Sequence, residues 1–221
     1  MSTRDLVEPD ATHDERHHLL RTWAEDFDFG CMFLSYHRLQ LEHFLVSELT
    51  RRRPYAVADI AQYEAPRTWF KDRGLCAEYS GLGLTKECDF HLDLLLDPPA
   101  DLRSRFDCVI CTEVLEHVKD PFRAARAMLA ILKPGGFLLG STPFCWADHR
   151  TAGYDDYWRF TEQGLQLLFS KFEDVSIRRI EWTSEGAQLY DLMRRFEGFG
   201  VRSETYMCTG FLFSARKESS E

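Results

Sequence analysis

The chain begins with two amphipathic segments and continues as short apolar runs that alternate with amphipathic segments. Apolar residues recur at helical spacing over residues 14–27 and 35–50, and this pattern predicts two helices. From residue 54 onward, apolar runs typical of buried strands are separated by segments with the period of a helix. Such an alternation is typical of an open α/β sheet with helices on both faces.

The boundaries follow from turn and capping residues. We expect strands over residues 55–61, 78–84, 90–95, 106–112, 137–142, 175–182 and 205–217. We expect helices over residues 66–74, 121–132 and 185–196, and one that begins after Thr161. Because the alternation weakens towards the end, we predict a Rossmann-like, mostly parallel sheet with an antiparallel C-terminal edge strand. Residues 1–53 form an N-terminal helical extension in this division, and residues 54–221 form the α/β domain.

Composition narrows the possible partners and the compartment. The 221 residues carry 36 acidic and 27 basic side chains and a net charge of −9, which argues against nucleic-acid binding. No apolar run approaches the roughly 18 residues that cross a bilayer, so we expect no membrane partner. The polar start and the seven cysteines favour a cytoplasmic protein with reduced thiols.

Cys108 and Cys111 form a C-x-x-C pair inside the apolar run over 106–112. No second pair of ligands follows at the spacing of a zinc site. We therefore interpret both as buried thiols and predict no metal site.

The connection over residues 142–161 is the longest polar and aromatic loop of the chain. Ligands bind at the carboxyl ends of strands in open α/β sheets, and a connection of this length is typical of a binding loop. Its candidate substrate-binding residues are Trp146, Tyr157, Trp158 and Arg159. An imidazole can move protons near neutral pH, so His149 is the candidate general base, oriented by Asp156 or His117. The alternative is that the aromatic side chains only cover the sheet while Asp156 pairs with Arg159.

The stretch FDCVICTEVLEHVKDPFRAARAMLAILKPGGFLLGSTPF, followed by DYWRFT, resembles the class I S-adenosylmethionine-dependent methyltransferases. The resemblance extends over about residues 57–217 and is closest to a branch found in glycan and natural-product pathways. It implies S-adenosylmethionine as cofactor, bound across the strand ends. The positions that it places beside the cofactor are Asp59, Ala61, Tyr63, Gly81, Gly83, Asp93 and Glu113.

Three of these positions depart from the family pattern. Ala61 and Tyr63 stand where the family has the glycines of a D-x-G-x-G turn, and Gly83 stands where an acid binds the ribose hydroxyls. Hydrogen bonds to charged groups contribute roughly 1.5–3 kcal/mol each. Loss of the family's glycine turn and of its ribose-binding acid therefore predicts weaker cofactor binding, unless other residues supply these contacts.

Two main functions follow, with a third alternative. The first is methyl transfer to an oxygen or nitrogen of a small polar acceptor, such as a sugar or a natural-product intermediate. The second is acid–base catalysis of an elimination, cyclisation or isomerisation on a fold that no longer binds the methyl donor. The third is a non-catalytic subunit, and a homodimer or a companion protein is compatible with each function.

Overall fold

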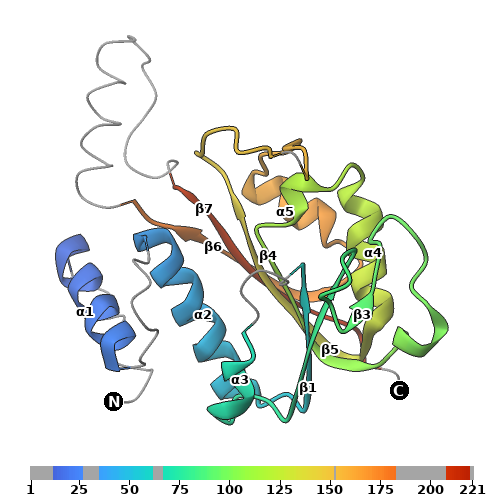
Figure 1. The fold of residues 1–221 in the computed structure, drawn as a ribbon. Helices are drawn as coiled ribbons and strands as arrows, with labels where there is room; N and C mark the ends of the chain where they lie inside the picture. Colours follow the sequence, from blue (N-terminus) through green and yellow to red (C-terminus); the bar gives the residue numbers. More distant parts are fainter. Residues whose placement is uncertain (1–11, 27–34, 62–66, 152, 183–207, 220–221) are drawn as a thin grey trace.

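The computed structural model describes residues 12–26, 35–61, 67–151, 153–182 and 208–219. A single sheet runs through the molecule, with α1 and α2 on one side and α4 and α5 on the other (Figure 1). The strands are β1 (Ala56–Ile60), β2 (Glu78–Gly83), β3 (Phe90–His91), β4 (Phe106–Thr112), β5 (Leu132–Pro143), β6 (Glu173–Ile180) and β7 (Gly210–Arg216). The helices are α1 (His13–Asp26), α2 (Tyr36–Arg52), α3 (Trp69–Asp72), α4 (Pro121–Ile131) and α5 (Glu162–Leu168).

The strand order is β3-β2-β1-β4-β5-β7-β6. Strands β1 to β5 pair in parallel, whereas β7 is antiparallel to both β5 and β6. The predicted fold class is therefore confirmed. The order reverses between β1 and β4, which places a crevice for ligands at the carboxyl ends of these two strands.

Four helices of the described chain begin at the side chain of a polar residue. The hydroxyl of Thr12 accepts the N–H of Glu15 at the start of α1. Ser35 and Thr161 accept a backbone N–H at the start of α2 and α5, and Asp120 does the same for α4. The sequence predicted Asp120 and Thr161 as caps, because their side chains satisfy amide groups that the first turn of a helix leaves unpaired. The helix expected over 185–196 lies outside the described residues.

β4 shows why the apolar run over 106–112 is continuous. Val109 and Cys111 pack into the cluster beneath α4 and α5, while Cys108 and Ile110 pack beneath α2 and α3. The two cysteines are free and fully buried, and they lie on opposite faces of the sheet. Burial raises the pKa of both thiols, so the prediction of buried thiols is confirmed.

β5 begins earlier than expected. The strand starts at Leu132, so the Lys133–Gly136 segment lies within it and does not precede it. Gly135 has φ of +75°, and its N–H donates to the carbonyl of Lys217 at 3.1 Å. A glycine tolerates this left-handed conformation, and the strand therefore continues through a segment that resembles a turn in sequence.

The helical extension packs on the sheet through α2. Trp23 of α1 contacts the ring of His43 of α2 edge-on, with centroids 4.9 Å apart. Among the described residues, no helix is long and apolar enough to cross a membrane. Nε2 of His43 is buried and has no hydrogen-bond partner within the same part of the chain. Burial lowers the pKa of His43 to about 4.

We predict that His43→Met reduces the pH dependence of stability. His43 binds its proton more weakly in the folded chain, so its contribution is complete above pH 6.5 and is lost as pH falls towards 4. The contribution of His43 to the free energy of unfolding that is lost in this way amounts to roughly 3 kcal/mol. Urea unfolding at pH 7.5 and pH 4.5 measures it, with the exposed His18→Met as control. Equal pH dependence of the two variants would contradict the prediction.

Candidate active site

The residue directly after β1 has a backbone conformation typical of glycine, although it is an alanine. Ala61 has φ of +60°, and its N–H donates to the carbonyl of Leu82 at 2.6 Å. A left-handed conformation is uncommon for a residue with a Cβ. The fold therefore holds Ala61 in the conformation that a glycine would adopt at this predicted cofactor position. Tyr63 lies outside the described residues.

The end of β2 carries no acidic side chain. A Cβ on Gly83 would lie 2.9 Å from Sγ of Cys88 and 3.6 Å from Cα of Ala61. The space beside residue 83 is thus already filled by Cys88. Gly81 lies within β2, and its N–H donates to Asp89 at 2.8 Å.

Asp93 follows β3 and is half-buried. Its Oδ1 accepts the N–H of Leu95 at 2.8 Å, which holds the carboxylate in a tight turn. This is the acid that the resemblance places near the adenine.

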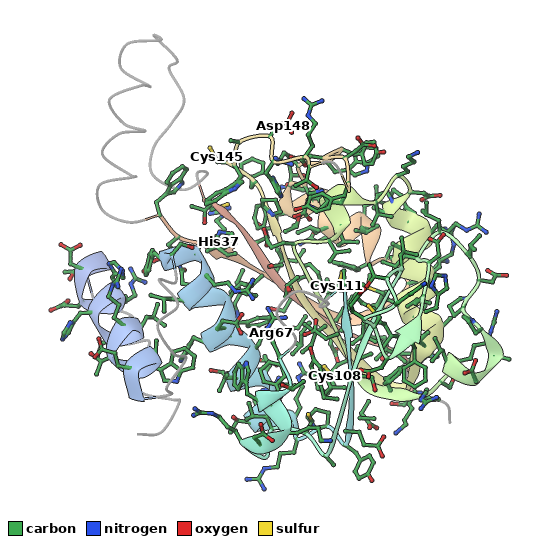
Figure 2. The ribbon with its side chains drawn as sticks, in the orientation of Figure 1. His37, Arg67, Cys108, Cys111, Cys145 and Asp148 are labelled. Carbon is green, nitrogen blue, oxygen red and sulfur yellow. The ribbon has the colours of Figure 1, made fainter. Side chains whose placement is uncertain are left out.

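A buried ionic cluster, here called the Arg67 cluster, lies beneath the turn after β1. It consists of Glu42, Asp59, Arg67 and Tyr79. Arg67 is 2% exposed and lies between α2 and the sheet (Figure 2). Its Nη1 donates to Oδ2 of Asp59 at 3.0 Å, and its Nη2 donates to Oε1 of Glu42 at 3.0 Å. The hydroxyl of Tyr79 donates to the same Oδ2 at 2.9 Å.

The two carboxylates of this cluster respond differently to their surroundings. Burial alone would raise the pKa of Glu42, but Arg67 and Arg38 hold it below its ordinary value. Burial raises the pKa of Asp59, and Arg67 offsets only part of that effect. Oδ1 of Asp59 is buried and has no hydrogen-bond partner among the described residues. It is therefore an acceptor in need of a donor.

Glu113 begins the loop after β4 with φ of +54°. Its Oε1 accepts the hydroxyl of Ser141 at 2.5 Å and lies 3.6 Å from Nε2 of His37. Burial works against its charge, but His37 and Ser141 hold the pKa of Glu113 below its ordinary value. Nδ1 of His37 in turn lies 2.9 Å from Oγ1 of Thr209. This contact joins α2 to the residue that directly precedes β7.

A second group of polar side chains, here called the Glu116 cluster, consists of Glu116, His117 and His149. Glu116 is 0% exposed, and its Oε1 lies 3.8 Å from Nε2 of His117 and 3.9 Å from Nε2 of His149. Within the described residues, neither carboxylate oxygen of Glu116 has a hydrogen-bond partner. Burial and the nearby charge of Glu113 raise the pKa of Glu116 to about 9.

Both histidines of the Glu116 cluster are held through Nδ1. Nδ1 of His149 lies 3.2 Å from Oδ2 of Asp156, which also accepts the N–H of His149 at 3.0 Å. Nδ1 of His117 lies 2.6 Å from the carbonyl of Asp155. The structure thus brings the predicted catalytic residues His117, His149 and Asp156 together.

Arg159 anchors the loop. Its guanidinium donates to both oxygens of Asp156, at 2.6 and 2.7 Å, and to the carbonyl of Ala147 at 3.0 Å. The hydrogen bonds from Arg159 hold the pKa of Asp156 well below its usual range. The Asp156–Arg159 pair of the alternative interpretation is therefore present, and Asp156 also contacts His149.

The three predicted aromatic residues of this loop are 40–49% exposed. Nε1 of Trp158 donates to the carbonyl of Val118 at 2.8 Å, and the hydroxyl of Tyr157 donates to Asp155 at 2.5 Å. The ring of Trp146 lies 5.6 Å from that of His37. Trp146 is thus the aromatic residue that borders the residues around Glu113.

Sequence reasoning missed the partners that come from other elements. They are Glu42, Arg67, Tyr79, His37 and Ser141. A charged residue on the apolar face of α2, such as Glu42, is the one signal that the sequence offered.

Comparison with known proteins gives one family and several similar folds. A family described as "Methyltransferase domain" matches residues 47–180. A ubiquinone biosynthesis O-methyltransferase of Xanthomonas oryzae pv. oryzae is 41% identical over 66 residues, which are 30% of this chain and 28% of that protein. The chain therefore spans less than a third of the length of this relative.

Solved structures resemble the whole fold at low identity. Phosphoethanolamine N-methyltransferase 2 of Haemonchus contortus has a TM-score of 0.55 at 14% identity. The match covers 99% of this chain and 60% of the Haemonchus contortus chain. The [4+2]-cyclase SpnF has a TM-score of 0.56 at 16% identity, covering 87% and 86%. These two comparisons support the fold alone.

We predict that Arg67→Met lowers the free energy of unfolding by about 3–5 kcal/mol at pH 7, because it leaves the buried carboxylate of Asp59 without a cation and that of Glu42 with Arg38 alone. The loss shrinks at pH 4, where protonation removes their charge. Chemical denaturation measures both values. Arg126→Met, at an exposed position of α4, is the control and changes stability by at most about 0.5 kcal/mol. Equal stability of the two variants would refute the role given to Arg67.

Proposed function

Because the chain belongs to the class I S-adenosylmethionine-dependent methyltransferases, we propose that it transfers a methyl group to an oxygen or nitrogen of a small polar acceptor. The observation that carries the proposal is the Glu116 cluster, where three proton-binding side chains converge beside the carboxyl end of β4. In an open α/β sheet this edge is where ligands react.

The residues at the strand ends fit S-adenosylmethionine in three respects. Ala61 has the left-handed backbone conformation that a glycine would adopt. The orphaned Oδ1 of Asp59 suits a donor such as the ammonium group of the methionine moiety. Asp93 is the proposed acceptor for the adenine amino group. Gly83 supplies no acid for the ribose, and this contact has no replacement among the described residues at the end of β2.

When bound, S-adenosylmethionine supplies a methyl group already activated on a sulfonium, so the protein's task is to position the acceptor and remove its proton. Nε2 of His149 faces the Glu116 cluster while Nδ1 contacts Asp156. This orientation is that of a general base held in one tautomer. We propose that Trp146, Tyr157 and Trp158 border the acceptor, and that Arg159 acts by holding Asp156.

A second function is favoured by a specific observation. Two donors already occupy Oδ2 of Asp59, and Gly83 offers no carboxylate. A fold with a weakened donor site can use the same acid–base groups for an elimination, cyclisation or isomerisation. SpnF, which has a similar fold, is described as a [4+2]-cyclase.

Calorimetric titration with S-adenosylmethionine and S-adenosylhomocysteine separates the two functions. We expect a dissociation constant in the micromolar range and about tenfold weaker binding to Asp93→Asn, which removes one charged acceptor. Asp97→Asn, at a nearby exposed position, is the control and leaves affinity unchanged. Absence of binding at millimolar ligand would overturn methyl transfer and favour the second function.

His149→Asn tests the proton-removal step. With a panel of phenols, sugars and amines as acceptors, release of S-adenosylhomocysteine measures turnover. We expect the variant to lose about 100-fold or more in turnover while its affinity for S-adenosylmethionine stays within twofold of wild type. Unchanged turnover would show that the base lies elsewhere.

A further inference from the structure

We propose that Glu116, His117 and His149 form a binding site for one divalent transition-metal ion of the Zn²⁺ or Mn²⁺ type. One ligand atom from each residue lies within 4.8 Å of the other two. Two imidazoles and a carboxylate are a donor set that such ions prefer.

The first argument is the unsatisfied carboxylate of Glu116. Its side chain is fully buried, and within the described chain neither oxygen accepts a hydrogen bond. A buried polar group without a partner is costly, and a buried charge more so. Both neighbouring imidazoles direct Nε2 towards Oε1, but at 3.8 and 3.9 Å they are too far for a hydrogen bond. A cation between the three groups would satisfy all of them.

The second argument is the tautomer that the surroundings impose on each histidine. A backbone carbonyl can only accept, so Nδ1 of His117 must carry the proton that it donates to Asp155. Nδ1 of His149 lies 3.3 Å from the carbonyl of Ala147 and 3.2 Å from the carboxylate of Asp156. Both groups only accept a hydrogen bond, so they impose the same tautomer on His149. Each ring therefore presents the lone pair of Nε2 to the centre of the Glu116 cluster. Metal-binding histidines are typically held in this way through their other nitrogen.

The third argument is the geometry. Ligand atoms on a tetrahedral ion, each about 2.0–2.2 Å from the metal, lie roughly 3.3 Å apart. In the cluster, Oε1 of Glu116 lies 3.8 and 3.9 Å from the two Nε2 atoms, and the three ligand atoms lie within 4.8 Å of one another. On binding an ion, the two shorter separations would have to shorten by roughly 0.5 Å. Three protein ligands leave at least one position open, which is typical of a catalytic and not a structural site.

The chemical role of the ion rests on the proposed function, whereas its binding does not. An acceptor oxygen at the open position would have its pKa lowered by the ion, and its proton would pass to solvent. In the loaded protein Nε2 of His149 is then a ligand, and the base role proposed above applies to the metal-free protein.

Metal binding is measured directly on the full chain. Protein treated with EDTA is titrated with MnCl₂, which disfavours thiolate ligands, and bound metal is counted after gel filtration. We expect about one equivalent for wild type and for His18→Gln, a control at an exposed position of α1. Glu116→Gln, His117→Gln and His149→Gln should each weaken binding at least tenfold.

Co²⁺ provides a second readout, since its visible absorption reports coordination. Wild type should develop a band that the three variants lack, while circular dichroism shows that they remain folded. Metal binding that is the same in the variants and in His18→Gln would overturn the site. Titration of the EDTA-treated protein with S-adenosylmethionine keeps the two hypotheses apart, because failure there would overturn the proposed function and leave the metal site standing.

Discussion

The guanidinium of Arg67 holds together the edge of the sheet on which the site is built. It neutralises Asp59 at the end of β1 and Glu42 of α2, and it also reaches Thr112 of β4. Since a buried charge is tolerated only when it is paired and hydrogen-bonded, these elements cannot separate without exposing or orphaning a charge. The end of β1, which leads into Ala61, and the end of β4, which leads into the next loop, are therefore held side by side.

The acids along this edge fall into two groups that differ in how their charge is compensated. Asp59 and Glu42 share Arg67, and Glu113 has Ser141 and His37 nearby. Glu116 lies within the same region, where the imidazoles of His117 and His149 lie 3.8 and 3.9 Å from its Oε1 and neither carboxylate oxygen has a hydrogen-bond partner among the described residues. Strongly perturbed buried acids cluster at functional sites, so this contrast separates the part of the edge that supports the fold from the part to which we assign the proposed chemistry.

Residue periodicity predicted β4 and the starts of α4 and α5, because burial of β4 and capping by Asp120 and Thr161 are local effects. The strand expected over 90–95 is shorter and ends at His91. Strand order, with β7 between β5 and β6, depended on pairing between segments distant in sequence. The early start of β5 depended on a glycine conformation, and no hydrophobic pattern encodes such a conformation.

The sequence by itself determined the fold class, the family, and the candidate trio of His117, His149 and Asp156, because each rests on residue types at short spacing. Only the tertiary structure decided which side chains compensate each other. Arg67 meets Glu42 and Asp59 through strand order and helix packing, and Glu116 is left unpartnered among the described residues by the same packing. Charge compensation acts through space over a few ångströms. It therefore depends on contacts that cannot be predicted from the spacing of residues along the chain.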